Sequence, residues 1–217
     1  MDRFIAQFDA EADGDLMLCR AHGVAYQKDR TDVVDYGADY FDKCLGYEDQ
    51  AIAQKINAGR IALVNGHVGQ NSVLDIGIGS GEFIKKRRGK TFGFDVNPVA
   101  SEWLKRQGLW ADRLNAFAGY TFWDVLEHVE TPETYLRQID LHAFLFTSVP
   151  IFDDLDTIRA SRHYRPGEHL YYWTDSGFVR WLDLHGFQIL ERQTFEIDAG
   201  RDSIHSYAFR RYRLPKL

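Results

Sequence analysis

The sequence has little cysteine, no long apolar run and no leader-like start. Its 217 residues include two cysteines, Cys19 and Cys44, which is too few for a disulfide framework and typical of a reducing compartment. The first residues combine neither a basic start nor an apolar core, which argues against a signal peptide. No stretch approaches the roughly 18 apolar residues that a membrane-spanning helix needs. These absences predict a soluble, cytoplasmic protein.

Basic charge is also scarce. The chain carries 26 lysines and arginines against 32 acids, a formal net charge of −6, and its pI is about 5.7. A protein that binds duplex nucleic acid usually presents a basic face to the phosphates. The single basic run, residues 85–90, follows a motif that should open a helix, and we interpret it as a solvated helix end. A small-molecule substrate is therefore favoured over nucleic acid, and nothing in the sequence specifies an oligomeric state.

The character of the chain changes near residue 70. Residues 1–70 are polar and rich in tyrosine, and 47–67 repeat apolar residues at helical spacing, so we predict a helical N-terminal extension that serves as a substrate lid or cap. Over residues 71–217, strand-like runs alternate with helical runs. The predicted strands are 72–79, 90–98, 119–125, 143–152, 187–197 and 204–213, and the predicted helices are 99–108, 131–139 and 174–186.

This alternation sets the predicted fold class. Strands alternating with helices form βαβ units, whose strands lie parallel and whose helices cover both faces of the sheet. The last two predicted strands are joined by a loop alone, which favours antiparallel pairing. We therefore predict an α/β fold with a doubly wound, mostly parallel, Rossmann-like sheet, an antiparallel C-terminal hairpin and the helical N-terminal extension.

A glycine-rich turn follows the first predicted strand. The stretch LDIGIGSGEF contains Asp75, Gly77, Gly79 and Gly81, and glycines in such a turn let the backbone approach a ligand with its amides facing outward. A dinucleotide site spaces its glycines differently, and an acid at the strand end suits a pyrophosphate poorly. Asp95 lies at the end of the next predicted strand, where a carboxylate can accept both hydroxyls of a ribose.

Four motifs in order carry a family resemblance. VLDIGIGSGEF, GFDVNP, FWDVLEHV and LFTSVPIF resemble the successive motifs of class I S-adenosylmethionine-dependent methyltransferases over about residues 72–210. The resemblance implies S-adenosylmethionine as the cofactor. The stretch between the predicted helix 99–108 and the predicted strand 119–125 is shorter than the family commonly has. For this stretch the resemblance implies that Trp110 stacks on the adenine ring and that Asp112 contacts it. The implied cofactor-binding residues are Asp75, Gly77, Ile78, Gly79, Gly81, Asp95, Val96, Trp110, Asp112 and Trp123.

Two acids and a histidine end the third predicted strand. Asp124, Glu127 and His128 stand at i, i+3 and i+4, so they would project from one face if the chain became helical there. Oxygen and nitrogen donors of this kind suit Mg²⁺ or Mn²⁺. His169, in the loop after the fourth predicted strand, is the candidate fourth ligand. Both segments belong at the carboxyl edge of the sheet, where ligands bind in such folds.

A narrower resemblance touches the same residues. The acid-x-x-Glu-His arrangement followed by HLYYWT is similar to metal-dependent small-RNA 3′-terminal 2′-O-methyltransferases, and LEHV alone is similar to ubiquinone-pathway O-methyltransferases. The resemblance implies a divalent ion held by Asp124, Glu127, His128 and His169. Two alternatives stay open. Glu127 and His128 act without metal, with His128 as the base, or the three residues are purely structural.

Two further clusters remain undecided. The aromatic residues of 36–49 form either a lid over the substrate mouth or a helix packed on the sheet. Cys19 and His22 have metal-ligand spacing, with Cys44 as a third candidate, but a structural zinc site needs four ligands.

The predicted function is methyl transfer from S-adenosylmethionine to an oxygen of a small polar molecule. Sugars, nucleotide-sugars and catechol-like acceptors all fit, with His128 and Glu127 as the catalytic residues and possible help from a divalent metal. The alternatives are 2′-O-methylation of an RNA 3′ end, which the net acidity opposes, and a cofactor-binding module that acts by docking to a partner.

Overall fold

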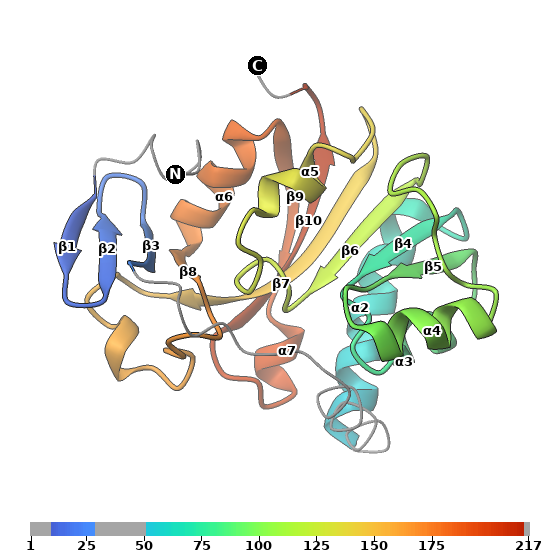
Figure 1. Cartoon of the computed structure of the whole chain (residues 1–217), viewed down its shortest axis with the longest axis horizontal. Coiled ribbons are helices and arrows are strands. Elements are labelled where there is room, and N and C mark those ends of the chain that lie inside the picture. The colour runs from blue at the N-terminus through green and yellow to red at the C-terminus, as the bar shows by residue number, and fades with distance from the viewer. Residues whose placement is uncertain (1–9, 29–50, 215–217) are drawn as a thin grey trace.

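A mostly parallel sheet forms the centre of the molecule (Figure 1). The computed structural model describes residues 10–28 and 51–214. The central strands are β4 (Val73–Ile76), β5 (Thr91–Phe94), β6 (Gly119–Trp123) and β7 (Phe144–Phe152). They lie parallel in the order β5-β4-β6-β7, and this order brings the carboxyl ends of four strands to one edge.

A C-terminal hairpin continues the sheet beyond β7. Its strands are β9 (Phe187–Gln193) and β10 (Ile204–Arg211), and a short helix, α7 (Phe195–Asp198), joins them. Strand β10 pairs antiparallel with β7 on one side and with β9 on the other. The predicted α/β class, the mostly parallel sheet and the antiparallel hairpin are therefore confirmed.

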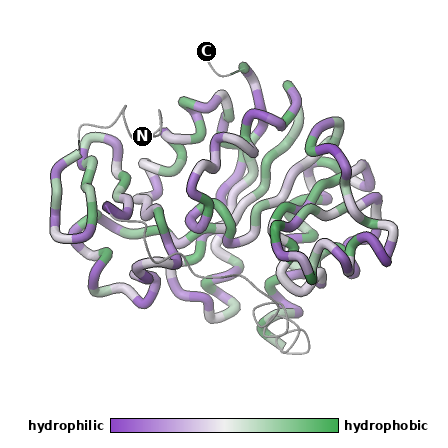
Figure 2. Tube along the Cα trace, viewed as in Figure 1, coloured by the Kyte–Doolittle hydropathy of each residue, from purple (hydrophilic) through white to green (hydrophobic). Residues whose placement is uncertain are grey.

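Helices cover both faces of this sheet. They are α2 (Ala51–Val68), α3 (Glu82–Lys86), α4 (Pro98–Arg106), α5 (Pro132–Leu136) and α6 (Asp175–Leu184). Successive strand residues point to opposite faces, so Val73 and Phe146 join the core under α2, whereas Leu74 and Leu145 join the core under α5 and α6. Figure 2 shows hydrophobic stretches of chain along the strands. No helix in the described part of the chain is long and apolar enough to cross a membrane.

The N-terminal extension departs from the prediction in part. Helix α2 confirms the helical part, but residues 10–28 contain three short strands, β1 (Glu11–Asp13), β2 (Leu16–Cys19) and β3 (Val24–Gln27). They form an antiparallel meander that pairs with β8 (Tyr171–Thr174), which lies parallel to the end of β7. Strands of three or four residues carry too little periodicity to be predicted, and they depend on a partner strand from far along the chain.

The candidate metal spacing at Cys19 and the basic run 85–90 can be compared with the structure. The aromatic residues of 36–49 and Cys44 lie outside the described residues, while the Cys19 Sγ lies 3.1 Å from His22 Nδ1. In the basic run, Lys86 pairs with Glu82 as a helix end would, but Arg87 is 3% exposed. The Arg87 guanidinium donates hydrogen bonds to side-chain and backbone oxygens around it. The run is therefore only partly a solvated helix end.

Candidate functional site

The glycine loop, residues 77–81, connects β4 to α3. Gly77, Gly79 and Gly81 all have positive φ angles, of 74°, 53° and 76°, which favours glycine. A side chain at Gly77 would meet Val125 at 2.6 Å, and one at Gly81 would meet Trp103 at 2.9 Å, whereas nothing lies within 4 Å of the Gly79 position. The backbone at Gly79 is thus the part of the loop that a ligand can approach.

Asp95 fastens this loop to the end of β5. Its Oδ2 accepts a hydrogen bond from the Ile78 backbone N–H at 2.8 Å, and its Oδ1 accepts one from Asn97 N–H at 2.8 Å. Burial raises the pKa of Asp95 above its usual value, against the effect of these bonds. The next residue, Val96, is an apolar side chain that is 71% exposed. A half-buried carboxylate beside an exposed apolar side chain suits a ligand with a sugar and a flat ring.

Asp75 lies beneath the loop, inside the sheet. It is 1% exposed, and its Oδ1 accepts a hydrogen bond from Thr121 Oγ1 at 2.5 Å. Burial raises the pKa of Asp75 to about 7, although the bond from Thr121 and the charge of Arg60 oppose the shift. This carboxyl group therefore changes its charge near neutral pH.

The three predicted aromatic and acidic partners lie at different places. Trp110 forms a parallel bridge with Gly93 at the β5 edge, and its ring lies 5.3 Å from that of Phe94. Asp112 is exposed. Trp123 is 7% exposed, and the Arg60 guanidinium lies 4.9 Å from the centre of its ring. Trp123 is thus close to α2, and Trp110 belongs to the outer edge.

The chain turns sharply where β6 ends. Asp124 adopts a φ of +57°, its N–H donates to the Ser148 carbonyl, and a tight turn follows in which His128 N–H donates to the Val125 carbonyl. The helix that would place Asp124, Glu127 and His128 on one face therefore does not form. The Asp124 carboxylate instead pairs with Arg60 and Arg201.

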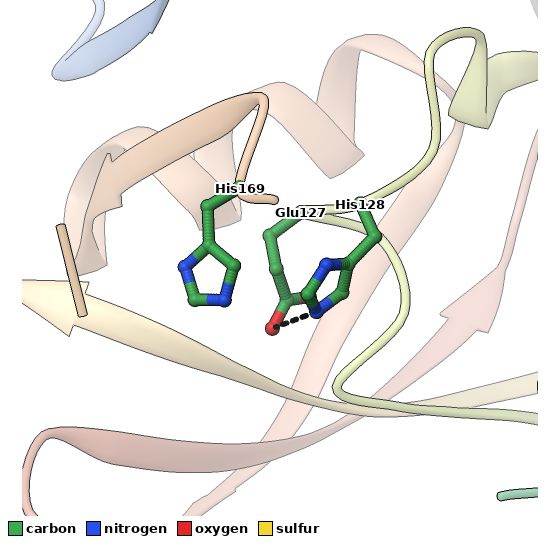
Figure 3. Close-up of side chains that lie close together, drawn as sticks. All are labelled: Glu127, His128 and His169. Atoms are coloured by element: carbon green, nitrogen blue, oxygen red, sulfur yellow. Dashed lines mark ion pairs between the residues drawn. The ribbon is translucent and has the colours of Figure 1, made fainter. Parts of the chain in front are cut away.

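Three of the four candidate ligands nevertheless come together. Donor atoms of Glu127, His128 and His169 all lie within 4.8 Å of one another, and we call these residues the His–Glu cluster (Figure 3). The two imidazole rings meet edge to face with centres 4.6 Å apart, and Glu127 Oε1 lies 3.9 Å from His128 Nε2. Residues 168–170 close the arrangement. The Glu168 carbonyl accepts a hydrogen bond from His128 Nδ1 at 2.9 Å, and Leu170 N–H donates to the Glu127 carbonyl at 2.7 Å.

Burial sets the protonation of this cluster. It lowers the pKa of His128 and lowers that of His169 to about 3, so both imidazoles are neutral at pH 7. Burial, followed by the charge of Asp124, raises the pKa of Glu127 well above its usual range. Because a carbonyl only accepts, His128 Nδ1 carries the hydrogen and Nε2 carries the lone pair. Among the described residues, Glu127 Oε2 and His169 Nδ1 are buried without a hydrogen-bond partner, so both atoms could serve as ligands.

Asp124 belongs to a different group. Its Oδ2 accepts hydrogen bonds from Arg60 of α2 and from Arg201, each at 2.8 Å, and both arginines also pair with Glu196 of α7. We call these four residues the arginine–carboxylate network. Burial alone would raise the pKa of Asp124, but Arg201 and Arg60 outweigh it and hold the pKa well below its usual range. Asp124 is therefore an anion committed to two cations.

Arg60, Glu196 and Arg201 escaped the sequence analysis. Arg60 stands 64 residues before Asp124, and Arg201 follows it by 77. No local spacing connects residues so far apart. The sequence places Arg60 one position before the apolar run of residues 61–64 in this helix, and that is a weak signal.

A polar cavity opens beside the network, one strand along the sheet edge. Its volume is about 510 Å³, and its wall includes Asp153, Asp175 and Asp202 together with apolar side chains of β7. The Asp202 carbonyl accepts a hydrogen bond from His163 Nε2 at 2.7 Å. The cavity has the size of a small-molecule pocket.

The sequence and the fold were compared with those of known proteins. A family model described as a methyltransferase domain matches residues 38–192. No curated protein matches the sequence.

Solved structures resemble the chain at low identity. The 1,6-didemethyltoxoflavin N1-methyltransferase of Burkholderia thailandensis, with bound S-adenosylhomocysteine, is 17% identical, covers 81% of this chain and 85% of its own, and has a TM-score of 0.57. The N-methyltransferase NodS of Bradyrhizobium japonicum, also with S-adenosylhomocysteine, is 16% identical over 85% and 100%, with a TM-score of 0.56. Magnesium protoporphyrin IX methyltransferase of Synechocystis is 15% identical over 81% and 96%, with a TM-score of 0.57. At these identities the likeness shows a shared fold.

Proposed function

The chain belongs to the class I S-adenosylmethionine-dependent methyltransferases, and from this premise we propose that it methylates an oxygen of a small polar acceptor. A sugar, a nucleotide-sugar or a catechol-like molecule has suitable chemistry. One observation carries the proposal. Val125, which contacts the Gly77 position of the glycine loop, is two residues before Glu127, so the segment that carries the His–Glu cluster also touches the glycine loop.

The cofactor half of the proposal follows from what the residues offer. The open backbone at Gly79 suits the methionine part of S-adenosylmethionine, Asp95 suits its ribose hydroxyls, and exposed Val96 suits the adenine ring. Trp110, which lies at the β5 edge, is proposed as a neighbour of the adenine ring. When bound, S-adenosylmethionine supplies an electrophilic methyl group.

The acceptor half rests on His128. Its pKa is lowered by burial, so the imidazole is a neutral base, and the Glu168 carbonyl fixes which nitrogen carries the lone pair. That nitrogen, Nε2, would take the proton from the acceptor hydroxyl as the methyl group is transferred. The protein would mainly align the two reactants, since methyl transfer is an in-line displacement.

A divalent metal fits the same cluster as an alternative to the base role, since a metal on His128 Nε2 would use the lone pair that otherwise accepts the proton. Glu127, His128 and His169 would hold it, since Glu127 Oε2 and His169 Nδ1 are buried without partners in the described part of the chain. When bound, the ion would lower the pKa of an acceptor hydroxyl. Two imidazoles and one carboxylate favour Mn²⁺ over Mg²⁺, which prefers oxygen donors. Asp124, committed to Arg60 and Arg201, is not proposed as a ligand.

Turnover of an acceptor panel tests the proposal. Each acceptor is incubated with S-adenosylmethionine that carries a radiolabelled methyl group, with and without Mn²⁺. The panel contains sugars, nucleotide-sugars, catechols and an oligoribonucleotide with a free 3′ end. Label is expected on a small hydroxylated acceptor, and His128→Gln is expected to abolish it while S-adenosylhomocysteine still binds by calorimetry. Label on the oligoribonucleotide alone would support the RNA alternative. Cofactor binding with no turnover on any acceptor would support a non-catalytic module.

A further inference from the structure

The N-terminal meander, β1 to β3, packs against the segment that carries His169. Strand β3 pairs antiparallel with β8, and the Gln27 backbone N–H donates to the Leu170 carbonyl at 3.0 Å. Strands β4 to β7, β9 and β10 pair with one another without the meander, which joins the same ten-stranded sheet through β8. Its contact with β8 lies directly beside a residue of the His–Glu cluster.

A buried chain of hydrogen bonds leads from the meander to His169. The Gln27 side-chain Nε2 donates to the Tyr172 hydroxyl at 2.9 Å, and that hydroxyl donates to the His169 carbonyl at 3.0 Å. Gln27 is 4% exposed, Tyr172 1% and His169 4%. Because a carbonyl oxygen only accepts, the Tyr172 hydroxyl is the donor to His169, and the chain of bonds runs in one direction.

Gln27 and Tyr172 form a polar pair in apolar surroundings. Tyr172 lies in an apolar cluster with Leu16, Leu18 and Phe152. An amide side chain placed there costs free energy unless it is hydrogen-bonded, and a leucine could occupy the same space without that cost. What the pair adds is a fixed direction for the His169 carbonyl, and with it the orientation of a histidine whose ring meets His128 edge to face.

We propose that Gln27 and Tyr172 are positioning residues for His169, through which the N-terminal meander takes part in catalysis. The inference rests on the proposed function, because it assigns the His–Glu cluster a role in methyl transfer. The two residues do not touch the reacting atoms. They hold the backbone of His169 so that its imidazole keeps its place beside Glu127 and His128.

Tyr172→Phe tests the chain, with Tyr164→Phe as the matched control. Tyr164 lies in the loop before β8, and its hydroxyl also donates to the meander, at Asp15, but among the described residues it makes no hydrogen bond to His169. Tyr172→Phe is expected to lower kcat about 10-fold with little change in KM. It is also expected to move the NMR resonances of the His169 imidazole, which are assigned at a single pH by their loss in His169→Gln. Tyr164→Phe is expected to do neither. Equal effects of the two variants overturn the proposal.

A second variant separates positioning from stability. Tyr172→Phe leaves the Gln27 amide buried and unpaired, so Tm is expected to fall by about 3–8 °C. Gln27→Met combined with Tyr172→Phe removes both polar groups, so most of the Tm should return. The lowered kcat and the moved His169 resonances should persist in the double variant. If kcat returns together with Tm, the pair is only structural and the proposal fails.

The two hypotheses can fail separately. In one outcome, the wild-type protein methylates no acceptor while the His169 resonances still move in the double variant Gln27→Met/Tyr172→Phe. In that case the positioning holds and the proposed function is wrong. If the wild-type protein is an active methyltransferase and these resonances stay in place, the positioning is wrong and the proposed function stands.

Discussion

The two halves of the site are assembled in different ways. The half that we propose for the cofactor takes Asp75, the glycine loop and Asp95 from about twenty consecutive residues, and backbone amides make its principal bonds. The half that we propose for the acceptor joins Glu127 and His128 to His169 by carbonyl contacts with residues 168–170, and the neighbouring arginine–carboxylate network draws Arg60 and Arg201 from far along the chain. A site built from local backbone is rigid by construction, whereas one built from distant side chains depends on the whole fold.

The largest expected effect comes from His128→Gln, which breaks the acceptor half alone. Loss of the base should lower kcat by about 10²–10⁴-fold, while the dissociation constant of S-adenosylhomocysteine stays within about 2-fold, because the glycine loop and Asp95 are untouched. Single-turnover kinetics and calorimetry measure the two quantities. A parallel loss of cofactor affinity would show that the two halves are one unit.

Arg60→Met removes one cation from the arginine–carboxylate network. Its side chain is 12% exposed and pairs with Asp124 and Glu196, and breaking a buried pair by removing one partner costs about 3–5 kcal/mol. Urea denaturation should show a loss of this size. Arg106→Met, which breaks an exposed helical pair with Glu102, is the control and should change the free energy of unfolding by less than about 0.5 kcal/mol. Similar losses would mean that the network contributes no more than a surface pair.

Asp75→Asn probes the pH dependence of the cofactor half. The native carboxyl has a pKa of about 7, against an ordinary value of 3.8, so the folded protein binds the extra proton. Stability is therefore expected to fall as pH rises from about 4 to about 7, by at most about 4 kcal/mol. Asparagine keeps an acceptor for Thr121 and cannot ionise, so this slope should flatten. An unchanged slope between pH 4 and pH 8 would contradict the raised pKa.

Asp95→Asn is the converse of the His128 variant. Hydrogen bonds to a charged group are worth about 1.5–3 kcal/mol, so weakening those from Ile78 and Asn97 and the contact with ribose should raise the dissociation constant of S-adenosylhomocysteine by about 10- to 100-fold. At saturating cofactor, kcat should recover, because the His–Glu cluster is intact. Failure of kcat to recover would show that Asp95 also aligns the methyl group.

Local patterns predicted the cofactor half, and distance limited the rest. The glycine spacing, Asp95 and the strands β4 to β7 follow from residues within a few turns of one another. His169 was found as a candidate because parallel strands end at one edge. The grouping of Asp124 with Glu127 failed, because a positive φ at a single residue redirects the strand end. The meander and the network stayed hidden, since each needs a partner more than 60 residues away.

The smallest expected effect concerns the outer contact of the meander. Arg20 and Asp156 form a two-pronged ion pair at 2.7 and 3.1 Å, with side chains 57% and 70% exposed. Solvent screens such a pair, so Arg20→Met should leave stability nearly unchanged and kcat unaltered. Urea denaturation and turnover measure both. The pair joins the meander to the loop after β7, whereas Gln27 and Tyr172 join it to β8, so a kcat as low as that of Tyr172→Phe would mean that any tether of the meander suffices. An unaltered kcat would locate the catalytic contribution of the meander in its buried bonds.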